Sequence, residues 1–191
     1  MKRSFFTLLF FICTTTSPAQ KNISCLIKTQ LGNITVELYP SRAPVTVANF
    51  LKYVDAHLYD SSSFFRAVTL NNQPKDSVKI EVIQGGNVDS VKEFAPISLE
   101  TTKQTGLLHK DGTISMARGK PATATSSFFI CINDQSSLDF EGKRNKDGQG
   151  FAAFGKVVEG MNVVKKIQQL HPEQGQYFKP PVTIISITRL K

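Results

Sequence analysis

Short runs of strand-forming residues, divided by turn residues, extend over most of this chain and limit it to few folds. Residues 26–39 have the pattern of a hairpin, because a turn at Gly32 and Asn33 separates two stretches with alternating apolar positions. The other strand-like runs are residues 64–68, 80–83, 113–117, 128–132, 153–158 and 182–190. Two segments, 47–58 and 161–170, have apolar residues at helical spacing. Many short strands with two helices predict a mostly antiparallel β-barrel or sandwich, and 191 residues suit one domain.

The N-terminus has the pattern of a secretory signal peptide. Lys2 and Arg3 provide a positive start, residues 4–13 are predominantly apolar, and Ser17-Pro18-Ala19 places small residues at the usual cleavage positions. The apolar run is about half as long as the roughly 20 residues that a membrane span needs. We therefore expect a signal peptide over residues 1–19, a domain over residues 20–191, and export to the periplasm without stable membrane insertion.

The three cysteines bear on export and on redox state. Lipid attachment at Cys13 is the alternative to a cleaved signal peptide, but Phe10 and Ile12 are bulky where such sites usually have small residues, so we rank it second. Cys25 and Cys131 each lie in an apolar strand-like run. In an oxidising compartment they could form a disulfide, yet burial in such runs favours two free thiols.

The net charge of +8, from 23 Lys and Arg against 15 Asp and Glu, raises the question of nucleic-acid binding. The basic residues are scattered, with their densest run at residues 143–147. A groove for nucleic acid needs basic residues interleaved with exposed aromatic ones, whereas most aromatic residues here lie in apolar strand-like runs. We therefore interpret residues 143–147 as a solvated loop and expect no nucleic-acid partner.

The residue patterns of common catalytic and metal sites are missing from the sequence. It contains no Gly-x-Ser-x-Gly, no phosphate-binding loop and no His-Glu-x-x-His. His57, His109 and His171 are far apart, and none has a second ligand at metal spacing. We expect no metal and no cofactor, so an enzyme of this sequence would have to act by binding and electrostatics.

Five segments in a fixed order carry the most specific signal. They are residues 64–66 (Phe-Phe-Arg), 83–87 (Ile-Gln-Gly-Gly-Asn), 112–118 (Gly-Thr-Ile-Ser-Met-Ala-Arg), 126–130 (Ser-Ser-Phe-Phe-Ile) and 151–161 (Phe-Ala-Ala-Phe-Gly-Lys-Val-Val-Glu-Gly-Met). Together they resemble the cyclophilin family of peptidyl-prolyl isomerases, from about residue 27 to residue 190. The resemblance implies an eight-stranded antiparallel β-barrel capped by two α-helices. Side chains would fill its interior, and the substrate groove would lie on the outer wall.

The resemblance also implies roles for single residues. Arg66 matches the catalytic arginine, Gln84 the glutamine that helps to hold it and bonds the substrate backbone, and Phe129 the floor of the proline pocket. Ala117 and Arg118 match the pair that aligns the peptide, although animal members usually have Asn in place of Arg118. The other residues expected to bind substrate are Val82, Met116, Ser127, Leu138 and Phe151.

These residue types suit the isomerisation of X–Pro bonds, which has a barrier of about 20 kcal/mol and needs no covalent nucleophile. A fixed guanidinium can donate a hydrogen bond to the prolyl nitrogen, which gains a lone pair as the amide twists, while an apolar pocket holds the ring. We expect a monomeric peptidyl-prolyl cis-trans isomerase that acts on proline-containing polypeptides. The alternatives are a non-catalytic peptide-binding or chaperone-like module of the same fold, and an envelope-attached structural barrel.

Two features depart from the family pattern near the expected site. Arg66 and Gln84 are 18 positions apart, where short members use far fewer. Residues 71–77 are polar and include Pro74, so we expect an inserted surface loop that tolerates shortening. Glu81 falls where the family usually has an aromatic pocket wall, which predicts a negative charge at the pocket edge and a weaker wall on that side.

Overall fold

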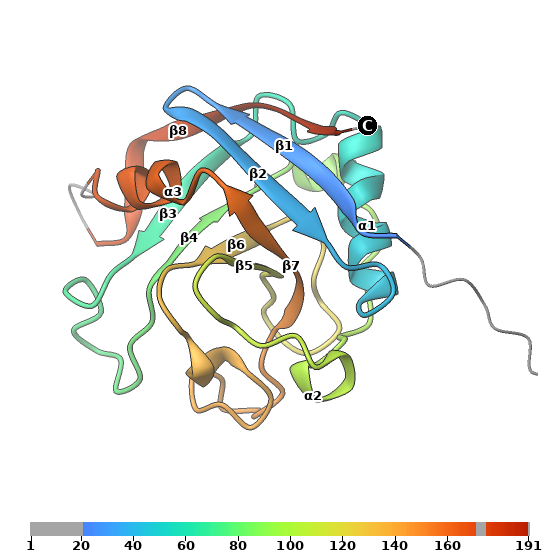
Figure 1. Cartoon of the computed structure of the whole chain (residues 1–191). Coiled ribbons are helices and arrows are strands. Elements are labelled where there is room, and N and C mark those ends of the chain that lie inside the picture. The colour runs from blue at the N-terminus through green and yellow to red at the C-terminus, as the bar shows by residue number, and fades with distance from the viewer. Residues whose placement is uncertain (1–20, 171–174, 191) are drawn as a thin grey trace, which may run out of the picture.

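The computed structural model describes residues 21–170 and 175–190, which form a closed β-barrel (Figure 1). The strands follow one another around the barrel in the order β1-β2-β7-β5-β6-β4-β3-β8, and neighbouring strands are antiparallel. This confirms the predicted fold, whereas the predicted signal peptide lies outside the described residues. The strands are β1 (Ile23–Thr29), β2 (Gly32–Leu38), β3 (Ser63–Val68), β4 (Val82–Gly85), β5 (Thr113–Met116), β6 (Phe128–Cys131), β7 (Ala152–Glu159) and β8 (Tyr177–Arg189).

Two main helices cap the barrel at opposite ends, α1 (Pro44–Asp55) and α3 (Met161–Gln168), as predicted (Figure 1). Proline suits the first turn of α1 because its missing N–H would have no partner there. The Glu100 carboxylate accepts the free backbone N–H groups of Val45 and Thr46 at 3.1 and 2.8 Å, and a negative charge is favourable at this end of a helix. The shorter helical elements are α2 (Thr102–Thr105), η1 (Ser90–Lys92) and η2 (Ser136–Leu138).

Aromatic rings pack where α1 meets the barrel interior. The ring of Phe50, on α1, lies 5.5 Å from that of Phe128 in an edge-on arrangement and 5.3 Å from that of Phe154. Phe128 meets Phe64 and Tyr59 in the same edge-on way. Edge-to-face packing places the positive rim of one ring on the negative face of another. The helix therefore closes its end of the barrel with side chains that are fully buried.

A second apolar cluster lies on the outside of the barrel wall. Phe128 and Phe129 are neighbours on β6, so their side chains point to opposite faces of the sheet. Phe128 belongs to the core, and Phe129 belongs to the outer cluster. The outer cluster contains Val68, Ile80, Val82, Phe129, Cys131 and Leu138, with Ala117 and Phe151 packed against it. This position agrees with the expected separation of an inner core from an outer binding wall.

Cys25 and Cys131 are both free and buried, as the sequence favours. Burial raises the pKa of the Cys25 thiol to about 11 and the pKa of the Cys131 thiol well above its ordinary value. Both groups are therefore protonated at neutral pH, and protonated thiols are poor nucleophiles.

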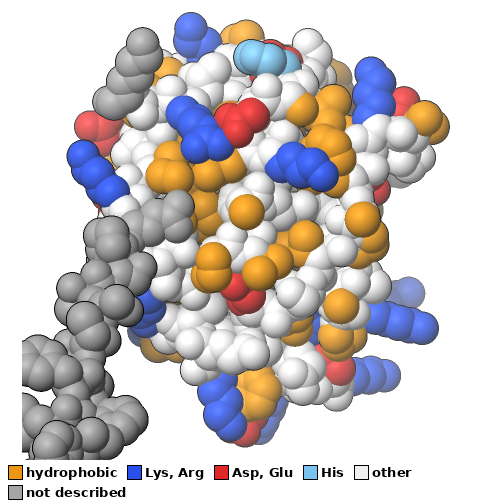
Figure 2. Space-filling model, turned by 90° about the vertical axis from the view of Figure 1, so that its right-hand side faces the viewer, with side chains coloured by type: hydrophobic (Ala, Val, Ile, Leu, Met, Phe, Trp, Pro, Cys, Tyr) orange, Lys and Arg blue, Asp and Glu red, His pale blue; other side chains and the backbone are white. Residues whose placement is uncertain are grey.

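Charged side chains do not form a continuous basic surface on the face shown in Figure 2. Lys and Arg side chains are spread over that face among polar, apolar and acidic ones. Within residues 21–170 and 175–190, no helix has the length and apolar character of a membrane span. The same residues bring together no group of three His, Cys, Asp or Glu side chains that could hold a metal ion.

Gly155, on β7, marks a place where β2 comes too close for a side chain. A Cβ built on Gly155 would lie 2.4 Å from the backbone oxygen of Glu37 and 3.0 Å from a methyl carbon of Leu38. We predict that Gly155→Ala lowers the free energy of unfolding by about 1–3 kcal/mol, because the paired backbone of β2 cannot move aside. Urea denaturation measures the change. Gly119→Ala is the control, since its Cβ would approach nothing nearer than Thr123 Oγ1 at 3.6 Å. Equal stability of the two variants would contradict the close packing of β2 on β7.

Candidate active site

A small cavity, here called the Arg66 cavity, lies on the outer wall over β3, β4 and β6. Its volume is about 110 Å³. Of the ten predicted site residues, Met116 and Ser127 are the two that do not line it. The lining residues are Arg66, Ile80, Val82, Gln84, Ala117, Arg118, Phe129, Leu138 and Phe151.

The register of three strands brings Arg66, Gln84 and Phe129 into one row. Arg66 of β3 pairs with Gln84 of β4, and Gln84 pairs with Phe129 of β6. Residues that pair directly point to the same face of a sheet, which here is the outer face. Their neighbours Ile83 and Phe128 point inward and are fully buried in the core. Three residues far apart in the sequence therefore present one cation, one amide and one ring at the same place.

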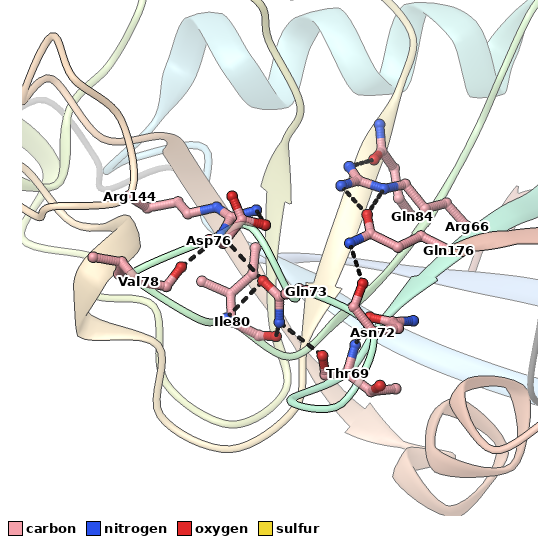
Figure 3. A network of polar contacts seen from close by, with 10 residues as sticks. All are labelled: Arg66, Thr69, Asn72, Gln73, Asp76, Val78, Ile80, Gln84, Arg144 and Gln176. Carbon is pink, nitrogen blue, oxygen red and sulfur yellow. Dashed lines mark hydrogen bonds and ion pairs between the residues drawn. The ribbon is translucent and has the colours of Figure 1, made fainter. Parts of the chain in front are cut away.

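Two amide groups hold the guanidinium of Arg66 (Figure 3). Arg66 Nη1 donates to Gln84 Oε1 at 3.0 Å. Arg66 Nε donates to Gln176 Oε1 at 2.9 Å, and Nη2 donates to the same oxygen. The sequence predicts the contact with Gln84, but it gives no signal for Gln176, which comes from the segment before β8.

The environment of Arg66 is partly apolar. Burial lowers the pKa of the Arg66 guanidinium below its ordinary value, while the neighbouring Tyr177 acts in the opposite direction. An arginine side chain nevertheless stays protonated in proteins. The Arg66 cavity thus has a permanent cation beside Gln84, and apart from these two residues and Arg118 its lining is apolar.

The floor of the cavity has a second layer of polar contacts behind it. The ring of Phe129 meets that of Phe151 edge-on at 5.2 Å and stacks on the ring of His109 at 5.9 Å. His109 is fully buried, with Nδ1 at 2.7 Å from Asp139 Oδ1 and Nε2 at 3.0 Å from Ser115 Oγ. The imidazole therefore has a polar partner for each nitrogen, and its ring supports the Phe129 ring from behind.

Ile80, and not Glu81, faces the cavity on the side that the sequence analysis expected to be weak. Side chains alternate along the extended chain, so residues 80, 82 and 84 share a face. Ile80 is 7% exposed and lines the cavity beside Val82. Glu81 points away, and its Oε2 accepts a hydrogen bond from Asn133 Nδ2 at 2.9 Å. The prediction of a negative charge at the pocket edge is therefore wrong, and alternation from Val82 could have identified Ile80.

Met116 and Ser127 differ from the other predicted contact residues. Met116 is 1% exposed in the barrel core, opposite Phe128, because it points inward from β5. Its predicted role as a substrate contact is therefore corrected to that of a core residue. Ser127 is half-buried, and its carbonyl accepts the backbone N–H of Ala117 at 2.8 Å. This bond joins the two chain segments at the rim of the cavity.

The side chain of Arg118 fixes the loop that carries Phe151. It is 1% exposed and donates to both carboxylate oxygens of Asp147, at 2.8 and 2.9 Å. Its Nε and Nη2 donate to the Gly150 carbonyl at 2.8 and 2.6 Å. The guanidinium carbon also lies 5.2 Å from the centre of the Phe151 ring. A planar fork with five N–H donors can make all these contacts at once, which a lysine cannot.

The inserted loop between β3 and β4 folds around Gln73. Most of residues 71–77 are exposed, as predicted, but Gln73 is 1% exposed. Its Nε2 donates to the carbonyls of Thr69 and Ile80, both at 2.8 Å, and its Oε1 accepts the N–H of Ile80 at 3.2 Å (Figure 3). Removing Gln73 would leave the backbone of Ile80 without these partners. Gln73 is therefore a fixed point within an exposed loop, and the loop's tolerance of shortening stays a prediction.

Arg144 ties this loop to the loop on the other side of the cavity. It donates to Gln73 Oε1 at 3.1 Å and to the Val78 carbonyl at 2.6 Å, and its Nη2 lies 3.3 Å from Asp76 Oδ2 (Figure 3). The Arg144 side chain is 15% exposed. The interpretation of residues 143–147 as a solvated loop is thus wrong for Arg144, whose inward contacts have no signature in a charge pattern.

Comparison with known proteins identifies the family that shares this sequence and this fold. The family model "Cyclophilin type peptidyl-prolyl cis-trans isomerase/CLD" matches residues 24–189. A peptidyl-prolyl cis-trans isomerase of Acinetobacter baylyi is 36% identical over 178 residues, covering 88% of this chain and 86% of that protein. Peptidyl-prolyl cis-trans isomerase A of Dickeya dadantii is 38% identical, covering 87% and 82%. A crystal structure of a Cryptosporidium parvum cyclophilin type peptidyl-prolyl cis-trans isomerase has a TM-score of 0.73 at 20% identity, covering 90% and 99%, which shows the shared fold.

The ion pair between Arg118 and Asp147, beside the cavity, leads to a prediction about the titration of Asp147. The hydrogen bonds from Arg118 hold the pKa of the Asp147 carboxyl below its ordinary value, which is about 4 in unfolded chains. The pair therefore stabilises the fold above that pH and is lost as the pH falls through the lower folded-state pKa. We expect Arg118→Lys to raise the titration midpoint of Asp147, measured by carboxyl carbon NMR. The midpoint of Asp55, which pairs with Arg189 elsewhere, is the internal control. An unchanged Asp147 midpoint would contradict the bidentate contact.

Proposed function

Because this chain belongs to the cyclophilin-type peptidyl-prolyl cis-trans isomerases, we propose that the Arg66 cavity is the place where it isomerises X–Pro bonds. It is an enzyme of that class, and its substrates are proline-containing polypeptides. In our proposal Arg66 is the catalytic donor, Gln84 helps to hold it and bonds the substrate backbone, and Phe129 is the floor under the prolyl ring.

The observation that carries the proposal is a fixed guanidinium at the end of an apolar cavity. Arg66 Nη1, Nε and Nη2 donate three hydrogen bonds to Gln84 and Gln176. An arginine has five N–H donors, so each terminal nitrogen keeps one N–H for a substrate. The guanidinium is thus oriented before any substrate arrives, and its remaining donors need no reorganisation during the reaction.

The chemistry requires binding that is selective for the twisted amide. A planar X–Pro amide delocalises the nitrogen lone pair into the carbonyl, and rotation by a quarter turn localises that pair on nitrogen. A donor placed at the prolyl nitrogen therefore binds the twisted state more tightly than either planar isomer. Uncatalysed isomerisation takes tens to hundreds of seconds. Shortening this time to milliseconds needs a rate acceleration of roughly 10⁴- to 10⁶-fold, which lowers the activation free energy by about 5–8 kcal/mol. One charged hydrogen bond in an apolar site supplies a substantial part of that amount.

The apolar lining gives the substrate a fixed axis of rotation. Val82, Leu138 and the paired rings of Phe129 and Phe151 surround a space of about 110 Å³. A prolyl ring held there stays still while the carbonyl on its N-terminal side turns. No described residue accepts a hydrogen bond from Gln84 Nε2, so this group can donate to a substrate carbonyl. We assign peptide alignment to the chain at Ala117, Arg118 and Ser127, which forms the rim of the cavity.

A binding module without catalysis is the alternative function. Such a protein needs the apolar cavity, but it has no need for a guanidinium held on two edges. The two amide contacts of Arg66 therefore favour catalysis.

We also propose that this isomerase acts on exported proteins, and the support is the residue pattern of positions 1–19. We predict that the exported protein starts at Gln20, since Ser17-Pro18-Ala19 has small residues at the cleavage positions. Intact-mass spectrometry of the protein recovered from the periplasm checks this. A lipid-modified protein starting at Cys13 would replace this proposal with membrane anchoring.

For catalysis, we predict that Arg66→Ala lowers turnover of a short X–Pro peptide by at least about tenfold while the protein stays folded. Arg66→Lys should recover little, because an ammonium lacks the planar fork that both amides hold. Exchange NMR measures cis–trans interconversion, and thermal denaturation checks folding. Arg189→Ala is the matched control, since that arginine forms an exposed pair with Asp55. A fully active, folded Arg66→Ala protein would remove Arg66 from the mechanism.

A further inference from the structure

Gln176 is fixed at the active site by its main chain as well as by its side chain. It lies immediately before β8, whose first residue, Tyr177, pairs with Arg66. The Gln176 carbonyl accepts the backbone N–H of Ala67 at 2.9 Å. Its position relative to β3 is therefore set by the sheet, and its half-buried side chain reaches back along Arg66.

The hydrogen bonds of the Gln176 amide determine which way round it lies. Its Oε1 accepts from Arg66 Nε and Nη2, and its Nε2 donates to the backbone carbonyl of Asn72 at 3.1 Å (Figure 3). Arginine has donors only, and a backbone carbonyl is an acceptor only. The reversed amide would place NH₂ against the guanidinium and oxygen against the Asn72 oxygen, losing every bond. The orientation is therefore unambiguous.

Gln84 and Gln176 together fix the orientation of the Arg66 guanidinium. Gln84 holds Arg66 through a single nitrogen, Nη1, and one hydrogen bond leaves the guanidinium free to swing about that contact. Gln176 takes the opposite edge, formed by Nε and Nη2. Contacts on both edges define the plane of the guanidinium and thus the direction of its remaining N–H groups.

The contact with Asn72 connects this edge to the inserted loop. Asn72 Oδ1 accepts the N–H of Thr69 at 2.8 Å, and Asn72 Nδ2 donates to the carbonyl of Ala67 at 3.0 Å. Both bonds fix the Asn72 carbonyl, which in turn accepts from Gln176. The loop, β3 and the segment before β8 therefore meet at one amide group.

We propose that Gln176 is a positioning residue for isomerisation: it sets the plane of the Arg66 guanidinium and couples the loop at residues 69–73 to catalysis. The inference rests on the proposed role of Arg66. Gln176 acts on the twisted amide through Arg66, so its loss lowers the rate of rotation more than the affinity for the peptide.

The test is Gln176→Ala in the chain from residue 20, with one X–Pro peptide and exchange NMR. We expect kcat to fall about tenfold, because misaligned catalytic groups lose rate steeply. The peptide dissociation constant should change by less than about twofold, since the apolar lining remains. Exchange of the Arg66 Nε–H with water should become faster, and Gln176→Glu, which keeps an acceptor oxygen, should restore slow exchange. Gln30→Ala, at an exposed glutamine in the β1–β2 turn, is the matched control.

Three results would overturn the inference. The first is a kcat for Gln176→Ala that lies within about twofold of the kcat for Gln30→Ala, because misalignment of Arg66 should lower kcat about tenfold. The second is a loss of rate matched by an equal loss of affinity and of thermal stability, which indicates a structural role. The third is Arg66 Nε–H exchange as fast in Gln176→Glu as in Gln176→Ala.

Loop coupling is tested separately with Asn72→Ala. Its effect on kcat should appear in the wild-type background and largely vanish in Gln176→Ala, since both changes break one chain of contacts. Additive effects would refute the coupling. Measuring Arg66→Ala in parallel separates the two proposals. If Arg66→Ala is inactive while Gln176→Ala has the wild-type kcat, only the positioning role of Gln176 is rejected. If Arg66→Ala is active, the proposed function of the Arg66 cavity is rejected.

Discussion

The alternation of side chains along β4 and β6, and along β3 from Arg66 onward, is the constraint on which the rest of the site depends. These stretches give one set of residues to the core and the other set to the outer wall, and on β3 a register shift between Phe64 and Arg66 precedes the alternating part. Phe128 cannot shift without disturbing the ring cluster under α1, so Phe129 cannot shift either. The position of the outer wall is therefore set by the packing of the core behind it.

The sequence was sufficient for the fold and for the central row of the site. Strand periodicity and turn residues predict a β-barrel or sandwich, and the resemblance of the ordered segments to the cyclophilins implies the barrel. The same resemblance points to Arg66, Gln84 and Phe129, which the register then aligns. Two errors arose at strand ends, where part of the information was present. Met116, the last residue of β5, lies opposite the core residue Phe128, and alternation back from Val82 places Ile80 instead of Glu81 on the cavity face.

The remaining contacts could not be predicted from a single sequence. Gln176 meets Arg66 across 110 positions, and Arg144 meets Gln73 across 71. Neither glutamine lies in a recognisable motif, and amide side chains have no periodicity when they occur singly in loops. Such contacts exist because a closed barrel brings distant loops to one rim, and the path of each loop depends on its own hydrogen bonds, as at Gln73.

The partners of Arg66 also explain why its charge stays available. Both side chains that hold it are neutral amides, so they orient the guanidinium without cancelling its charge. A carboxylate in either place would form a stronger hydrogen bond, but it would place a negative charge beside the position where, in the proposed mechanism, the prolyl lone pair develops. The inserted loop does contain one carboxylate, Asp76, and Arg144 pairs with it at 3.3 Å. Arg144 thereby anchors the loop beside the cavity. For the proposed reaction, which depends on binding a twisted amide more tightly than a planar one, an oriented cation without a carboxylate hydrogen-bonded to it is the arrangement that electrostatic stabilisation requires.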